Sequence, residues 1–75
     1  INPRSTVARV NRGFAWRLKN DYDKAIQDYD ETIRLDRRYA LAYHNRGIAW
    51  VLKKEYDKAI KDYDEAIRHG SWTAS

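Results

Sequence analysis

The chain lacks several residue types on which particular sites and folds depend. It has no cysteine, which excludes disulfide bonds, thiolate zinc sites and cysteine nucleophiles, although such a chain is compatible with any redox compartment. It has no run of about 20 apolar residues and no charged-then-apolar leader, so we expect neither a membrane span nor a signal peptide. The absence of an initiator methionine suggests a processed or excised piece. The sequence therefore assigns no cellular compartment.

The chain is short, and its positive charge gathers at one end. A domain of 75 residues buries only about 60% of its unfolded surface, so we expect one small domain of marginal stability. The net charge is +4, and residues 1–20 hold five bases and no acid, whereas the remainder holds 10 bases and 11 acids. This basic segment either attracts acidic peptides, nucleic acid or anionic membranes, or forms a solvated and partly paired helix face.

The sequence repeats itself at an offset of 34 residues. About 19 of the 32 aligned pairs from residue 6 onward are identical, which is far more than chance allows. A fixed period of this length is typical of helical repeat arrays. The longest matching segments are NRG at 11–13 and 45–47, YDKAI at 22–26 and 56–60, and DYDE at 28–31 and 62–65.

Each unit has the pattern of two helices. Apolar residues such as Ala25, Ile26 and Tyr29 recur at helical spacing, and no segment alternates like a strand. We therefore predict an all-α fold of two tandem helix-turn-helix repeats, residues 6–39 and 40–73, with a short tail at 74–75. Lys54 stands where the first unit has Asn20, so the second turn is expected to be less favourable. The four antiparallel helices are expected at about residues 6–19, 23–36, 40–53 and 57–70.

Four positions in each unit match a known repeat pattern, W-x2-L-G-x2-Y, then A-x3-F, then P. The matching residues are Gly13, Trp16, Ala25 and Tyr29 in the first unit, and Gly47, Trp50, Ala59 and Tyr63 in the second. By these residues the chain resembles the tetratricopeptide repeat, a resemblance that implies a helical solenoid used for protein binding. Pro3 matches the closing proline, so residues 1–5 are expected to be the tail of a preceding unit. The departures are Arg12 and Arg46 for leucine, Arg9 for tryptophan, and Arg37 and Ser71 for proline.

An arginine in each unit lies on the stripe of the first helix that faces the second helix. Asp28 occupies the answering stripe opposite Arg12, and Gly13 allows the two backbones to approach closely. We therefore hypothesise that Arg12 pairs with Asp28 inside the first hairpin. By the repeat, Arg46 pairs with Asp62 inside the second hairpin. Such pairs set helix register rather than add net stability. The alternative is that the arginines point outward and bind a ligand carboxylate or phosphate.

The resemblance also implies that the first helix of each unit lines a concave groove that binds an extended peptide or a helix. Helical spacing gives these helices a second, largely apolar stripe, part of which is buried against the neighbouring unit. We therefore expect an apolar or amphipathic protein partner. The predicted groove residues are Val10, Asn11, Phe14, Arg17, His44, Asn45, Ile48 and Val51.

The ends of the two-repeat array are expected to associate with other copies. Two repeats fall short of the roughly three that a stable array needs, and only residues 71–75 follow the last expected helix, so no polar capping helix is expected. Ile60 and Ile67 of the last helix suit contact with Val7, Val10 and Phe14 of another molecule. Head-to-tail stacking extends into a filament unless symmetry closes it, and exchange of a helix that gives a closed dimer is the competing route.

Other function classes have less support in the sequence. His44 and His69 are lone residues without a second ligand or a nucleophile at a recognisable spacing, so we predict no catalytic residues, no metal site and no enzyme activity. No glycine-rich phosphate loop is present, and no cofactor is expected. The alternative function is binding of RNA or another polyanion by the basic N-terminal helix, with aromatic side chains nearby for stacking. Membrane binding is not expected.

Overall fold

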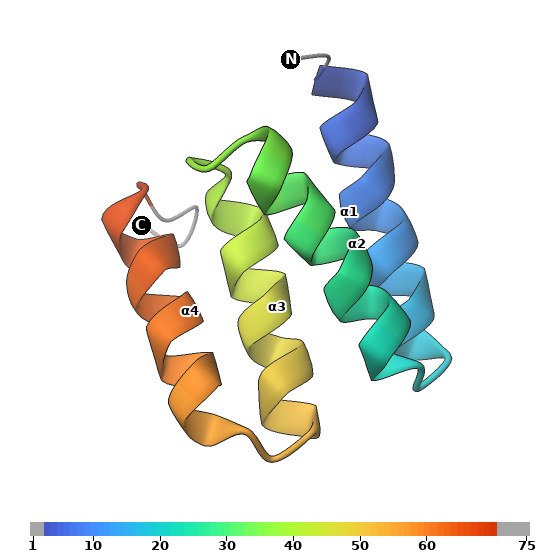
Figure 1. The fold of residues 1–75 in the computed structure, drawn as a ribbon, viewed down its shortest axis with the longest axis vertical. Coiled ribbons are helices and arrows are strands. Elements are labelled where there is room, and N and C mark those ends of the chain that lie inside the picture. Colours follow the sequence, from blue (N-terminus) through green and yellow to red (C-terminus); the bar gives the residue numbers. More distant parts are fainter. Residues whose placement is uncertain (1–2, 71–75) are drawn as a thin grey trace.

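A computed structural model describes residues 3–70, which fold into four helices (Figure 1). No strand occurs in this part of the chain. The first two helices form one antiparallel hairpin and the last two form a second, which confirms the predicted all-α arrangement of two repeats. The tail predicted at 74–75 and the position of Ser71 lie outside the described residues. The helices are α1 Pro3–Leu18, α2 Tyr22–Leu35, α3 Ala40–Leu52 and α4 Tyr56–Arg68.

The helix boundaries follow the sequence closely except at the first helix. The starts of α2, α3 and α4 lie within one residue of the predicted starts, and α4 ends at Arg68, two residues before the expected end. α1 begins at Pro3 instead of residue 6, so residues 3–5, expected in the tail of a preceding unit, form part of its first turn. Proline suits this place because the first turn of a helix needs no N–H donor and because its ring fixes a helical φ.

The turns inside the two hairpins have the same backbone geometry. Asn20 and Lys54 both have left-handed φ angles, of 66° and 65°. In each turn the N–H of the next residue donates to a helix carbonyl five residues earlier, at 2.9 and 2.8 Å, as in a Schellman motif. The cap that follows differs, because the Asp21 side chain accepts a hydrogen bond from the Lys24 N–H and Glu55 makes no such bond. Lys54 therefore adopts the same left-handed conformation as Asn20, although asparagine tolerates this conformation better than lysine.

A glycine in each hairpin lies against a tyrosine ring of the partner helix. A Cβ atom added at Gly13 would lie 2.6 Å from Cε1 of Tyr29, and one added at Gly47 would lie 2.7 Å from Cε1 of Tyr63. Both distances are far shorter than ordinary van der Waals contact. The repeated glycine is therefore required by the close packing of the two helices, and the tyrosine ring fills the space that a larger residue would need.

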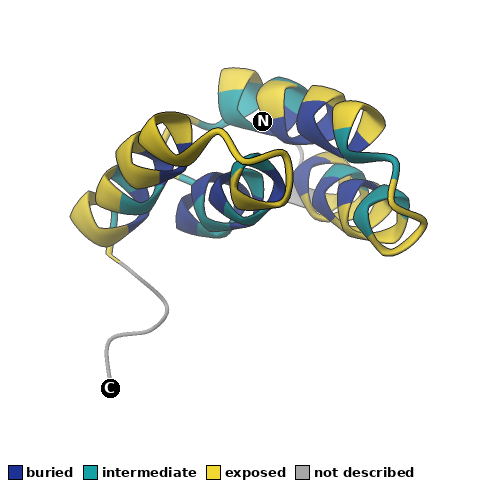
Figure 2. Cartoon of the chain, turned by 90° about the horizontal axis from the view of Figure 1, so that it is seen from below, coloured by how far each residue is buried: buried dark blue, intermediate teal, exposed yellow. Residues whose placement is uncertain are grey.

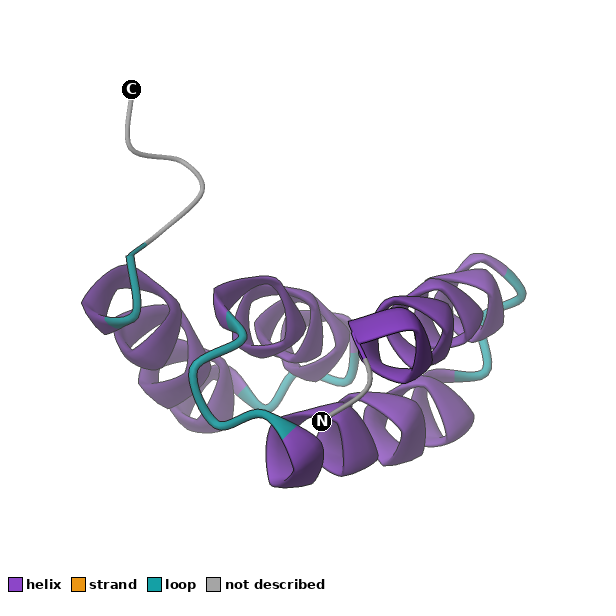
Figure 3. Cartoon of the chain, turned by 90° about the horizontal axis from the view of Figure 1, so that it is seen from above, coloured by secondary structure: helices purple, strands orange, loops and turns teal. Residues whose placement is uncertain are grey.

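The two hairpins join through α2 and α3. Ala25, Ile26 and Tyr29 of α2 form a buried cluster with Ala49 of α3, and both repeat tryptophans pack against it. α1 and α3 lie in one layer and α2 and α4 in the other (Figures 2 and 3). Within residues 3–70, α2 contacts helices of both hairpins, whereas α4 contacts α3 alone. One side of α4 is consequently left exposed (Figure 2).

Candidate protein-interaction surface

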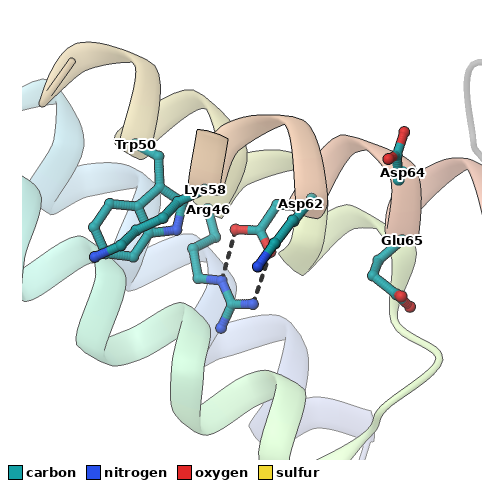
Figure 4. Close-up of a pocket in the computed structure, with 7 residues that line it drawn as sticks. Arg46, Trp50, Lys58, Asp62, Asp64 and Glu65 are labelled. Atoms are coloured by element: carbon teal, nitrogen blue, oxygen red, sulfur yellow. Dashed lines mark hydrogen bonds and ion pairs between the residues drawn. The ribbon is translucent and has the colours of Figure 1, made fainter. Parts of the chain in front are cut away.

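Each hairpin contains an arginine and an aspartate joined by two parallel hydrogen bonds. In the first, Nε of Arg12 donates to Oδ2 of Asp28 at 2.9 Å and Nη2 donates to Oδ1 at 2.7 Å. In the second, the same atoms of Arg46 donate to Asp62 at 2.8 and 2.7 Å, with the guanidinium turned toward the carboxylate (Figure 4). Such two-fold, charge-assisted contacts fix the relative position of the two side chains. The structure thus brings together the residues paired by the sequence hypothesis.

The two arginines differ in how much of the side chain is covered. The side chain of Arg46 is 22% exposed and that of Arg12 is 60% exposed, while both partner aspartates are nearly buried. Arg46 also donates from Nη1 to Oδ1 of Asp30 on α2, at 2.8 Å. The pKa of Arg46 is raised, first by its hydrogen bond to Asp62, although burial opposes the rise. In each pair the aspartate is therefore the more buried residue. Arg46 is more covered than Arg12 because α2 of the neighbouring hairpin contacts it.

A hollow of about 550 Å³ lies beside the Arg46–Asp62 pair (Figure 4). Its wall carries the indole of Trp50 and charged side chains of both signs, because α4 contributes Lys58 and Lys61 as well as Asp64 and Glu65. Since opposite charges alternate along this wall, it offers no concentrated field for an anion or a cation.

All eight predicted groove residues belong to α1 or α3. We call five of them, which keep some exposed surface, the α1/α3 face. Phe14 and Val51 are exposed, and Arg17, His44 and Ile48 are half-buried. The guanidinium of Arg17 lies over the ring of Phe14, 4.9 Å from its centroid. This face is therefore mainly apolar and carries a cation, Arg17, in the last turn of α1.

The other three predicted groove residues are placed differently. Val10 is 2% exposed and Asn45 is 8% exposed, so neither side chain is available to a ligand, and we remove both from the candidate face. Asn45 is buried because it lies one helical turn before Ala49, on the side of α3 that packs against α2. Asn11, its counterpart in the first unit, is exposed on the side of α1 that no described helix covers.

Arg17 influences two neighbouring groups where α1, α2 and α3 meet. Burial lowers the pKa of His44, and the charge of Arg17 lowers it further. Burial raises the pKa of Tyr29, and Arg17 partly offsets that rise. The Tyr29 hydroxyl nevertheless makes no hydrogen bond of normal geometry within the described residues. Burial and the charge of Arg17 thus both favour the neutral form of His44.

Two ion pairs between the hairpins were missed by the sequence reasoning. Arg46 of α3 binds Asp30 of α2, and Lys53, just after α3, binds Asp23 of α2. Spacing along one helix identifies which residues share a stripe, but it does not show which stripe meets the next hairpin. The available signal was that both aspartates and both bases recur at the 34-residue period.

The comparisons with known proteins agree with the geometry. A family model described as TPR repeat matches residues 13–53, and a second, described as tetratricopeptide repeat, matches residues 40–69. The chain belongs to the tetratricopeptide repeat (TPR) family. No curated protein matches it. TPR units generally mediate protein–protein interactions, and members of this family are typically non-catalytic scaffolds.

The described part of this TPR chain also bears on the other function classes. Residues 3–70 contain no group of three or more histidine, aspartate or glutamate side chains arranged to hold a metal ion. None of the helices in that range is both long and apolar enough to cross a membrane. For RNA stacking, the tryptophans are poorly placed, because Trp16 and Trp50 pack against the core and carry Lys24 and Lys58 on their rings, each 4.5 Å from the centroid.

Proposed function

We propose that this TPR chain is a non-catalytic scaffold that binds an amphipathic peptide or helix on the α1/α3 face. The observation that carries the proposal is the exposure of large apolar side chains there, with Phe14 41% and Val51 36% exposed. Val7, Leu18 and Leu52 extend the same apolar surface along both helices. Exposed apolar surface of this extent, bordered by polar residues, is typical of protein-binding sites.

The charges on this face favour an acidic partner. Arg17 lies among the apolar residues, and the first 20 residues carry all of the positive surplus of the chain. A helix with leucines on one side and glutamates at the border would bury its apolar side against Phe14 and Val51 while its carboxylates approach Arg17. The proposed ligand is therefore an amphipathic peptide or helix with acidic residues beside its apolar side.

A peptide titration tests this site directly. A synthetic amphipathic peptide of leucine and glutamate is added to labelled protein, and amide chemical shifts are followed; a scrambled peptide of equal composition is the control. We expect shifts on α1 and α3 that disappear in the variant carrying Phe14→Ser and Val51→Ser. Ile67→Ser, which removes an exposed apolar side chain from α4, should leave binding unchanged. Shifts that spare α1 and α3, or that persist in the double variant, contradict the proposal.

We also propose that the chain associates with itself through its repeat ends. Ile60 and Ile67 on α4 are 56% and 67% exposed, whereas Ile26, the counterpart of Ile60, is 7% exposed because α3 covers it. Covering the outer side of α4 in the same way removes apolar surface from water. Sedimentation over a wide concentration range should show growing assemblies for head-to-tail stacking and a closed dimer for helix exchange. A monomer throughout contradicts both routes.

A further inference from the structure

We propose that the outer face of α4 on one copy binds the outer face of α1 on a second copy, in the register in which α2 binds α3 within the chain. The outer face of α4 consists of Asp57, Ile60, Tyr63, Asp64 and Ile67. The outer face of α1 consists of Ala8, Asn11, Arg12 and Ala15, with Lys19 just after the helix. These residues replace Val7, Val10 and Phe14 of the sequence-based expectation, because Val10 is buried and Phe14 belongs to the α1/α3 face. The inference rests on the proposed self-association and specifies its contacts.

The internal contact between α2 and α3 supplies the template. Ala49 of α3 lies in the buried cluster with Ile26 and Tyr29 of α2. At the border of this apolar contact, Arg46 binds Asp30 and Lys53 binds Asp23. The interface therefore has an alanine at its centre and two ion pairs at its border. In both pairs the acid lies on the second helix of one unit, and the base lies on or just after the first helix of the next unit.

Every residue of this template recurs unchanged one period away. The acidic and apolar side recurs on α4, and the basic side recurs on α1, so one chain carries both halves of a second, unmade interface. On the acidic side, Asp23, Ile26, Tyr29 and Asp30 of α2 correspond in that order to Asp57, Ile60, Tyr63 and Asp64 of α4. On the basic side, Arg46, Ala49 and Lys53 correspond in that order to Arg12, Ala15 and Lys19.

The recurring residues are uncovered where their counterparts are covered. Ala15 is exposed, whereas Ala49 is completely buried. Ala8 is likewise exposed and lies between hollows of about 210 and 350 Å³ on α1, whereas its counterpart Ala42 is completely buried. The open side of α1 thus has small residues at the points where a packed helix requires them.

The hydrogen bonds identify the missing partner more closely. Arg12 uses Nε and Nη2 on Asp28, in the same arrangement as Arg46 on Asp62. The remaining nitrogen of Arg46, Nη1, binds Asp30, whereas Nη1 of Arg12 makes no hydrogen bond within residues 3–70. Asp64, the counterpart of Asp30, has no ion pair within that range either. An Arg12–Asp64 pair between copies gives both groups the contact that their counterparts already make.

The polarity of these contacts explains why the occupant is a second copy of this chain. The outer face of α1 offers Arg12 and Lys19, and the outer face of α4 offers Asp57 and Asp64, so the bases of one face meet the acids of the other in this register. A contact between two different faces of identical molecules is head-to-tail, and it continues into an open chain unless its rotation closes a ring. Each added copy presents the same two faces again.

Two variants block opposite ends. Asp64→Lys places a cation against Arg12 of the neighbour and blocks the α4 end, and Ala15→Lys places a long charged side chain where the template has a buried alanine and blocks the α1 end. Both positions are exposed and lie inside helices, so helicity should remain at the level of the unmodified chain. Each variant alone should associate at least about tenfold more weakly than the unmodified chain in sedimentation experiments.

Mixing the two variants is the decisive measurement. Ala15→Lys retains an intact α4 face and Asp64→Lys retains an intact α1 face, so an equimolar mixture should form one-to-one complexes and stop there. Phe14→Lys is the matched control, because it adds the same charge to the neighbouring position of α1 on the α1/α3 face; it should associate like the unmodified chain.

The alternatives give distinct results. A mixture that stays monomeric while the unmodified chain associates overturns the head-to-tail register. Association that survives in both single variants also overturns it, and then points to helix exchange or to another face. A monomeric unmodified chain at all concentrations overturns the proposed self-association itself. Peptide binding by the α1/α3 face is measured separately and is unaffected by any of these outcomes.

Discussion

The left-handed residue in each hairpin turn is the clearest place to test a single side chain. Lys54 has a φ of 65°, where a residue with a Cβ atom is strained and asparagine is better tolerated. We expect Lys54→Asn to raise the free energy of unfolding by about 0.5–1 kcal/mol. The reciprocal change Asn20→Lys, at a φ of 66°, should lower it by a similar amount. Urea denaturation measures both, and equal stability of all three proteins contradicts the assignment.

The glycine at the centre of each hairpin gives a second residue-scale prediction. Alanine favours a helix over glycine by about 1 kcal/mol, but at Gly13 its Cβ would overlap the ring of Tyr29, which is completely buried. We expect Gly13→Ala to lower the free energy of unfolding by about 1–3 kcal/mol, as overpacked cores do.

Gly47→Ala is the matched comparison for that substitution. Its Cβ would meet Tyr63, a half-buried ring with room to move on the open side of α4, so we expect a smaller loss than at Gly13. Thermal unfolding followed by circular dichroism measures the difference. If Gly13→Ala proves more stable than the unmodified chain, helix propensity outweighs packing and the close-contact explanation is wrong.

At the scale of elements, the ion pair of the second hairpin links three helices. Arg46 binds Asp62 of α4 and Asp30 of α2, so Arg46→Leu leaves the buried Asp62 carboxylate without its partner. Such a loss typically costs about 3–5 kcal/mol, a large share of the stability of a domain of this size. The double variant Arg46→Leu with Asp62→Leu should recover most of it, because no unpaired charge remains.

A double-mutant cycle measures the coupling between these two residues by chemical denaturation. The first hairpin provides the control, because Arg12 is largely exposed and water replaces it at Asp28 more easily. We therefore expect a larger coupling for Arg46 with Asp62 than for Arg12 with Asp28. A coupling energy of zero between Arg46 and Asp62 would contradict the hypothesis that this pair fixes the register of the two helices.

The helices and the pairing inside each hairpin were predictable because both depend on local spacing. Apolar residues at helical spacing predicted the four helices. Arg12 and Asp28 interrupt the apolar stripes of two facing helices at the same distance from the turn, which predicted their pairing. The start of α1 was missed because the closing-proline position of the repeat pattern was read as the end of a unit, whereas Pro3 begins a helix. Residues 3–5 thus extend α1 by a turn that α3 lacks.

The placement of the candidate face was harder to predict, because burial depends on how the hairpins stack. Val10 and Asn45 look accessible on an isolated helix, yet both are covered in the assembled layers. The pair between Arg46 and Asp30 depends on the same stacking, since the two residues belong to different repeats. The spacing of residues within one helix shows which side chains lie on the same side of that helix. Which other helix covers that side depends on how the repeats stack.

At the scale of the whole molecule, the proposed association through the outer faces of α1 and α4 makes the stability of the fold depend on protein concentration. A chain of this size has a small stability margin, and Ile60 and Ala15, whose counterparts Ile26 and Ala49 pack between the two repeats, are exposed. If folded copies stack through these faces and unfolded chains do not, association stabilises the folded state by mass action. At a concentration about 100-fold above the dissociation constant, this contribution reaches about 2.7 kcal/mol.

The melting temperature should therefore rise with protein concentration. For a domain of 60–100 residues, each kcal/mol moves the midpoint by about 4–8 °C, so a hundredfold increase in concentration across the dissociation constant should raise it by several degrees. The variant that carries both Ala15→Lys and Asp64→Lys has two blocked ends, and its midpoint should not depend on concentration. Scanning calorimetry measures both proteins. A constant midpoint for the unmodified chain would mean that the outer faces of α1 and α4 stay in water, and that the two hairpins are stable without a neighbour.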